Sequence, residues 1–186
     1  MDGIDLIENQ IDKLVELVAL TSLWASPIIV QELFKEENNP TASWYNNSRR
    51  YRKKNGEMPK TLKDGIWLDD NSKANNAIKA ALGFTKRPTH FATCHIYESS
   101  TYDCKYHTSI PNLVLVPTPI YSLTDHLKEC MQFLKYYSYT QYGFYIDQKP
   151  VKPEFWENIS LKAMLAPTDE QIKKALVSVK KRRRKI

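Results

Sequence analysis

The chain has 186 residues, of which 42% are hydrophobic and 26% are charged, and its formal net charge is +6. A chain of this length can bury a core without disulfide staples, and the composition is that of a globular protein. Residues 180–185 are all Lys or Arg and carry the whole excess of positive charge, because the remaining side chains balance at 21 basic and 21 acidic. We expect a basic C-terminal tail that binds a polyanion without sequence selectivity, or else a solvated end with no partner.

The cysteines and the N-terminus bear on cellular location. Three cysteines at irregular spacing argue against a disulfide framework and for a reducing compartment: Cys94, Cys104 and Cys130. Asp2 and Asp5 stand where a signal peptide would be basic, and the longest uncharged run, residues 17–30, is too short and too polar to span a bilayer. We expect a cytoplasmic protein with no membrane partner.

Two helices are predicted at the start of the chain. Apolar side chains recur every three or four positions and predict an amphipathic helix from residue 4 to about residue 24: Ile4, Ile7, Ile11, Leu14 and Val18. We expect this helix to pack against the body of the protein, with a homodimer contact as the alternative. A second helix follows Pro27 and ends near Glu37.

The next segment combines aromatic and basic residues. Asn39 and Pro40 are suited to begin a helix, which we expect to extend to about Lys54. Beside Trp44, Tyr45 and Tyr51 it carries a basic cluster, which is the candidate nucleic-acid contact: Arg49, Arg50, Arg52, Lys53 and Lys54. A solvated charged face is the alternative interpretation.

Further elements follow in order. A helix begins at Ser72, and Gly83 ends it. Strands are predicted over residues 91–97 and 113–116, with a polar loop between them, and a helical stripe follows over residues 120–137. Near the C-terminus, Thr168 and Gln171 form a capping box that predicts a last helix.

The histidines are concentrated in one part of the chain. All four lie between residues 90 and 126, and they surround an asparagine that precedes an apolar run. The sequence passes from Cys94-His95-Ile96 to Asn112-Leu113-Val114-Leu115-Val116 and then to Asp125-His126. Over residues 91–130 this order resembles the HNH endonuclease family, whose ββα-metal motif places a His-Ile/Val pair, an Asn before an apolar strand, and a helix-borne ligand in this succession.

The resemblance implies a fold and a division of the chain. The expected fold is α+β, with a ββα-metal (His-Me finger) nuclease core flanked by N- and C-terminal helices. The core would occupy residues 87–146. Residues 1–86 would form a helical region for oligomerisation and DNA contact, and residues 147–186 a C-terminal loop, helix and basic tail.

The resemblance also implies roles for individual residues. His95 would be the general base, since an imidazole with a pKa near ~6.5 suits that task at neutral pH. Asn112 would fix the loop that carries His95. His126 would bind a divalent metal ion, Mg²⁺ or Mn²⁺, which acts as a Lewis acid on the phosphate. Cys94 stands where the family often has Asp or His, and a thiolate there would favour Zn²⁺.

The sequence therefore predicts a metal-dependent endonuclease that hydrolyses double-stranded DNA, of a restriction, phage or anti-phage type. Two alternatives remain open. One is a non-catalytic, zinc-stabilised nucleic-acid-binding module in which Cys94 is structural. The other is a subunit of a larger DNA-processing complex. His107 is assigned mainly to structure, although it lies in the loop where a phosphate would pass.

Overall fold

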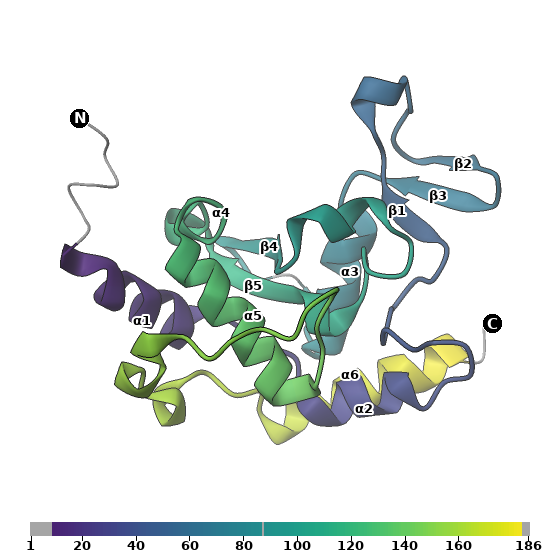
Figure 1. The fold of residues 1–186 in the computed structure, drawn as a ribbon. Coiled ribbons are helices and arrows are strands. Elements are labelled where there is room, and N and C mark those ends of the chain that lie inside the picture. The colour runs from purple at the N-terminus through teal and green to yellow at the C-terminus, as the bar shows by residue number, and fades with distance from the viewer. Residues whose placement is uncertain (1–8, 87, 184–186) are drawn as a thin grey trace.

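The computed structural model describes residues 9–86 and 88–183, and these form a mixed α+β fold (Figure 1). Its α-helices are α1 (Ile11–Thr21), α2 (Pro27–Phe34), α3 (Ser72–Ala81), α4 (Leu123–His126), α5 (Lys128–Tyr142) and α6 (Asp169–Arg183). Its strands are β1 (Ser48–Arg50), β2 (Thr61–Lys63), β3 (Ile66–Asp69), β4 (Phe91–His95) and β5 (Leu113–Pro117). Within these described ranges, none of the helices combines the length and the apolar character that a bilayer crossing requires.

The antiparallel pair β4–β5 lies at the centre of the molecule, and its register runs from Phe91 opposite Pro117 to His95 opposite Leu113. Side chains alternate between the two faces of a strand. Cys94 and Val114 belong to a cluster formed with α1 and α5, whereas Leu113 and Leu115 belong to a second cluster. Both faces of β5 are therefore buried, which explains why its first four residues are all apolar.

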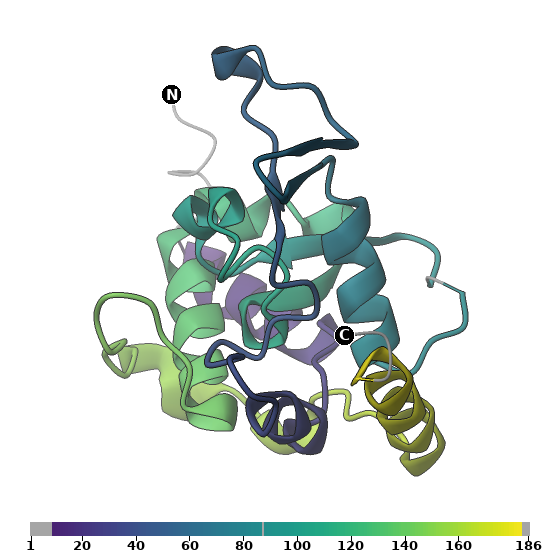
Figure 2. The ribbon, with the colours of Figure 1, turned by 90° about the vertical axis from the view of Figure 1, so that its right-hand side faces the viewer.

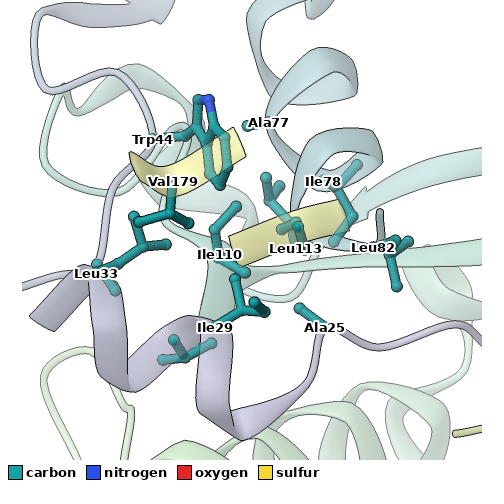
Figure 3. Packing of buried hydrophobic residues seen from close by; sticks show 14 of the residues in the cluster. Ala25, Ile29, Leu33, Trp44, Ala77, Ile78, Leu82, Ile110, Leu113 and Val179 are labelled. Atoms are coloured by element: carbon teal, nitrogen blue, oxygen red, sulfur yellow. The ribbon is translucent and has the colours of Figure 1, made fainter. Parts of the chain in front are cut away.

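The second cluster joins segments that are far apart in the sequence (Figure 3). Ile29 and Leu33 from α2, Ile78 from α3 and Val179 from α6 gather around Leu113. Both clusters draw residues from each of the ranges 1–86, 87–146 and 147–186. The helical first part and the C-terminal helix thus share their hydrophobic cores with the β4–β5 pair.

The other sheet forms a projection, called here the arm, which comprises residues 48–69. Its strand order is β1-β3-β2, with β1 parallel and β2 antiparallel to β3. The arm extends from the rest of the molecule in both views (Figures 1 and 2). Its strands are three or four residues long, and β2 is exposed along its whole length.

The prediction of a helix over residues 40–54 is wrong. Asn39 does not cap a helix, because its side chain accepts a hydrogen bond from Ser43 N at 2.8 Å and donates to Ser43 O at 3.0 Å, which closes a turn. Trp44 N then donates to Thr108 O at 2.9 Å, and Ser48 pairs with Trp67 in the sheet. Partners distant in sequence therefore satisfy this backbone, and they override the local helix signal.

Two other helices differ from expectation at their limits. The stripe over residues 120–137 is interrupted at Leu127, whose extended backbone separates α4 from α5. The first helix begins at Ile11, and its predicted start at Ile4 and Ile7 lies outside the described residues. The strands predicted near residues 91–97 and 113–116 and the helix from Ser72 are confirmed.

The C-terminal helix is confirmed together with its cap. Thr168 N donates to Gln171 Oε1 at 2.8 Å, and Gln171 N donates to Thr168 Oγ1 at 3.3 Å, so the capping box is formed. The helix continues through the first part of the predicted tail to Arg183. Arg182 pairs with the largely buried carboxylate of Glu36, which follows α2, and this pair holds that part of the tail beside the end of α2. Arg184 and Lys185 lie outside the described residues.

Gly83 is the point where the end of α3 meets the start of α6. Its φ is +72°, and a Cβ added there would overlap the backbone carbonyl of Gln171. Gly83→Ala should therefore lower the free energy of unfolding by roughly 2–4 kcal/mol, from left-handed strain and backbone overlap together. Gly56→Ala is the matched control, because Gly56 has a φ of +67° with no atom near its Cβ position, and it should lose only about 1–2 kcal/mol from the strain alone. Equal losses in urea denaturation would show that the overlap at Gln171 does not matter.

Candidate active site

His95 ends strand β4, and its ring is half-buried. Its Nε2 lies 2.9 Å from the backbone carbonyl oxygen of His107. A carbonyl oxygen only accepts hydrogen bonds, so Nε2 is the protonated nitrogen that donates, and Nδ1 of the neutral ring carries the lone pair. The backbone of one loop residue thus fixes both the tautomer and the orientation of the imidazole.

The surroundings of His95 favour its neutral form. Burial lowers the pKa of His95 to about 4, and the electrostatic effects of His107 and Arg50 act in the same direction. Arg50 is exposed on β1, and its charge also lowers the pKa of Tyr121, although burial and Asp125 outweigh it and raise that pKa to about 12. His95 and Tyr121 therefore both lie within electrostatic range of the exposed cation of Arg50, and the imidazole is neutral.

Asn112 holds the loop that follows His95. Its Oδ1 accepts from Tyr97 N at 3.1 Å, while its Nδ2 donates to Ser100 Oγ at 2.7 Å and to Tyr106 O at 3.1 Å. Asn112 is fully buried, so these contacts are shielded from water. They span the loop from its beginning to the residue before His107, and they hold this loop against the start of β5.

His107 and Asp69 form a buried, hydrogen-bonded pair next to His95. His107 Nε2 lies 2.9 Å from Asp69 Oδ2, and both side chains are fully buried. Asp69 also accepts from Ser72 Oγ at 2.8 Å and from Lys73 N at 2.9 Å. The rings of His107 and His95 stack with centroids 5.2 Å apart. Asp69 belongs to the arm, so this pair joins the arm to the loop whose carbonyl orients the base.

Cys94 faces away from His95, toward α4. Its thiol donates to Thr124 Oγ1 at 3.3 Å, and burial raises its pKa to about 12. A protonated thiol is a poor metal ligand, and hard cations such as Mg²⁺ prefer oxygen. Within residues 9–86 and 88–183, moreover, no three His, Cys, Asp or Glu side chains come together as a site for one ion. The described side chains therefore do not by themselves fit the metal centre that the resemblance implies.

The remaining predicted site residues lie apart from one another. His126 is exposed at the end of α4, and its side chain takes part in no hydrogen bond or ion pair with another described residue.

In the basic cluster, Arg49 is occupied by a bidentate pair with Glu57, at 2.6 and 2.8 Å. Arg52 stacks on Tyr102 with its guanidinium 4.8 Å from the ring centroid. Lys53 and Lys54 are exposed on the short 3₁₀ helix Lys53–Asn55 at the tip of the arm. The basic cluster thus lies on the arm rather than on an α-helix.

Sequence reasoning assigns no site role to Asp69 or Tyr121, and it assigns His107 to structure without identifying its partner. The hydrogen bond between Asp69 and His107 spans 38 positions, and no local pattern predicts such a pairing. The crowding of histidines near residue 95 was the one available signal for His107. Nothing in the sequence around Tyr121 distinguished it from the apolar stripe beside it.

Comparisons with protein-family models, with curated proteins and with solved structures found no match to this chain.

The buried pair predicts that Asp69 contributes more to the free energy of unfolding than its neighbour Asp70 does. Burial alone would raise the pKa of Asp69, but hydrogen bonds from His107, Ser72 and Lys73 more than offset it, so the net shift is downward. Asp69→Asn should lower the free energy of unfolding at pH 7 by about 2–4 kcal/mol, because it leaves His107 buried without its anion. Asp70→Asn is the matched control, since Asp70 makes a surface ion pair with Lys60 and should lose about 0–1 kcal/mol.

The pH dependence of that difference has a defined sign. A carboxylate with a lowered pKa stabilises the fold fully above its unfolded-state pKa, near ~3.9, and loses the contribution as the pH falls through the folded-state value. The difference in free energy of unfolding between wild type and Asp69→Asn, measured by chemical denaturation, should therefore have its full value at pH 7 and become smaller below about pH 4. If this difference became larger on acidification, Asp69 would not be ionised in the folded protein.

Proposed function

We propose that this chain is an endonuclease that hydrolyses phosphodiester bonds in DNA, with His95 as general base and Arg50 as a phosphate-binding residue. The observation that carries the proposal is the backbone-oriented imidazole of His95, held in its neutral form, within electrostatic range of the exposed Arg50. The succession of β4, β5 and α4 around His95 and Asn112 agrees with the resemblance to the HNH family. Double-stranded DNA as the substrate, a homodimeric assembly and a cytoplasmic location stay predictions.

The general-base step follows from the tautomer. Nδ1 of His95 takes a proton from a water molecule, and the resulting hydroxide attacks the phosphorus of the scissile phosphate. The P–O3′ bond then breaks, and the departing oxygen takes a proton from solvent. The products are a 5′-phosphate and a 3′-hydroxyl. The hydrogen bond from Nε2 to His107 O keeps Nδ1 in place during the transfer.

The phosphate-binding step follows from Arg50. A guanidinium binds a phosphate with paired, charge-assisted hydrogen bonds. Bound phosphate would also offset the effect of Arg50 on His95 and place a negative charge near the ring, so the pKa of His95 would rise when DNA binds. A base with a pKa of about 4 in the free protein would thereby become stronger in the complex.

A divalent ion, Mg²⁺, Mn²⁺ or Zn²⁺, remains a prediction of the resemblance, with His126 and Cys94 as its predicted ligands. The described side chains do not form a site for that ion. The two steps assigned to His95 and Arg50 use the chain's own groups.

Nicking of supercoiled plasmid DNA tests the proposal. His95→Ala should lower the nicking rate by at least ~10²-fold, the lower range for loss of a general base. His90→Asn is the matched control, because His90 is an exposed histidine at a φ of +61°, a conformation that Asn tolerates, and it should keep the wild-type rate. The assay is run with Mg²⁺, Mn²⁺, Zn²⁺ and a chelator to establish the metal requirement. Equal rates for His95→Ala and wild type would remove His95 from the mechanism.

The pH profile of nicking is a second test. The kcat/KM value reports the free enzyme, so with a His95 pKa of about 4 it should fall by less than about twofold between pH 7 and pH 5.5. An ordinary histidine would cause a drop of about tenfold. Arg50→Gln removes a charge that lowers the pKa of His95, so its profile should begin to fall at higher pH than that of wild type. Identical profiles for Arg50→Gln and wild type would show that Arg50 does not act on the base.

A further inference from the structure

A cavity of about 560 Å³ opens outside the His95 site, between the segment that leads into β1 and the C-terminal part of α6. One wall is formed by consecutive residues: Trp44, Tyr45, Asn46 and Asn47. The opposite wall is formed by residues one helical turn apart, Ser178 with Lys181 and Arg182. The volume lies within the range of about 300–1,000 Å³ that is usual for small-molecule sites.

The aromatic wall is held rigidly. Thr108 Oγ1 donates to Tyr45 O and accepts from Tyr45 N, at 2.9 Å each. Arg182 donates to the backbone carbonyl of Trp44, which ties this wall to α6. The ammonium of Lys73 lies 4.5 Å from the centroid of the Tyr45 ring. The Tyr45 ring is therefore in place before any ligand binds, whereas the Trp44 ring is buried in the hydrophobic core and offers no face to a ligand.

The polar groups at the rim are free to bind a ligand. Asn46 and Asn47 are exposed, and their side-chain amides make no hydrogen bond with another described residue. The ammonium of Lys181 is likewise exposed and forms no ion pair within the described chain. Arg182, by contrast, is occupied by Glu36. The free groups are thus two amides and one cation beside an aromatic surface.

This combination matches the chemistry of a nucleotide. Amide side chains form paired hydrogen bonds with base edges, aromatic rings stack on bases, and an ammonium attracts a phosphate. The cavity is also connected to the His95 site at two points. Thr108, which holds Tyr45, follows His107 in the chain, and the segment 44–47 continues into β1 and Arg50.

We propose that this cavity binds one unpaired nucleotide of the DNA substrate, with its base against Tyr45, its edge at Asn46 and Asn47, and its phosphate at Lys181. The proposal rests on the proposed endonuclease function, which supplies the DNA. An enzyme with such a site would recognise irregular duplexes in which a base leaves the stack, since an extrahelical base costs less to extract there.

The test compares three labelled duplexes that differ at one central position: a perfect duplex, the same duplex with one bulged 2-aminopurine nucleotide, and the same bulge with an abasic nucleotide. Binding is measured by fluorescence anisotropy with the His95→Ala protein in chelator, so that no cleavage occurs. Stacking of one base contributes about 1–3 kcal/mol, so the bulged base should bind roughly tenfold more tightly than the abasic bulge. Emission of 2-aminopurine should change on binding, because the base stacks on protein.

The Asn46→Ala/Asn47→Ala variant and Lys181→Ala should each weaken binding of the bulged duplex, and the first should remove the preference for the base. Lys180→Ala is the matched control, because Lys180 is the exposed neighbour that does not line the cavity. Equal affinity for the base-containing and abasic bulges would overturn the proposal, and so would an equal loss in Lys180→Ala and Lys181→Ala. Plasmid nicking that depends on His95 without any preference for the bulge would reject the cavity assignment alone. A preference without nicking would reject the endonuclease function alone.

Discussion

The buried hydrogen bond between Asp69 and His107 is the interaction on which the candidate site depends. It joins β3 of the arm to the loop between β4 and β5, and both partners are withdrawn from water. A buried charge is tolerated when it is paired and hydrogen-bonded, and Ser72 and Lys73 complete the shell around the carboxylate. With His107 fixed in this way, its carbonyl and its ring together define the position of His95.

Side chains alternate between the two faces of β4, so that Cys94 and His95 lie in different environments. Cys94 lies in a buried cluster near α4, where its thiol is protonated and bonded to Thr124, while His95 contacts His107 and lies within electrostatic range of Arg50. His95 is thus oriented by backbone and histidine contacts, and the proposed phosphate-binding residue, Arg50, lies on β1 rather than on a helix. The same connection brings the cavity at Trp44 and Tyr45 next to the loop, through Thr108. One short stretch, residues 107–108, supports both the proposed chemistry and the proposed recognition.

The sequence predicted elements whose signals are local. The apolar period of α3, the capping box of α6 and the fully apolar β5 each identify a segment without knowledge of its partners. The motif also points to Asn112, whose side chain binds the loop at Tyr97 N and at Ser100 Oγ.

The sequence could not predict contacts that join distant segments. Asn39 and Pro40 are typical of a helix start, yet Thr108 and Trp67 bind the following backbone and direct it into β1. For the same reason Asp69 was not recognised as a partner of His107. The electrostatic influence of Arg50 on His95 also arises only when β1 and β4 are brought near each other by the fold.

The most direct test of the central claim is the protonation state of His95, measured by ¹⁵N nuclear magnetic resonance on the isotopically labelled protein across a pH titration. The account predicts a neutral ring with its proton on Nε2 and a pKa of about 4. A proton on Nδ1, or a midpoint near the ordinary ~6.5 of a solvent-exposed histidine, would contradict it.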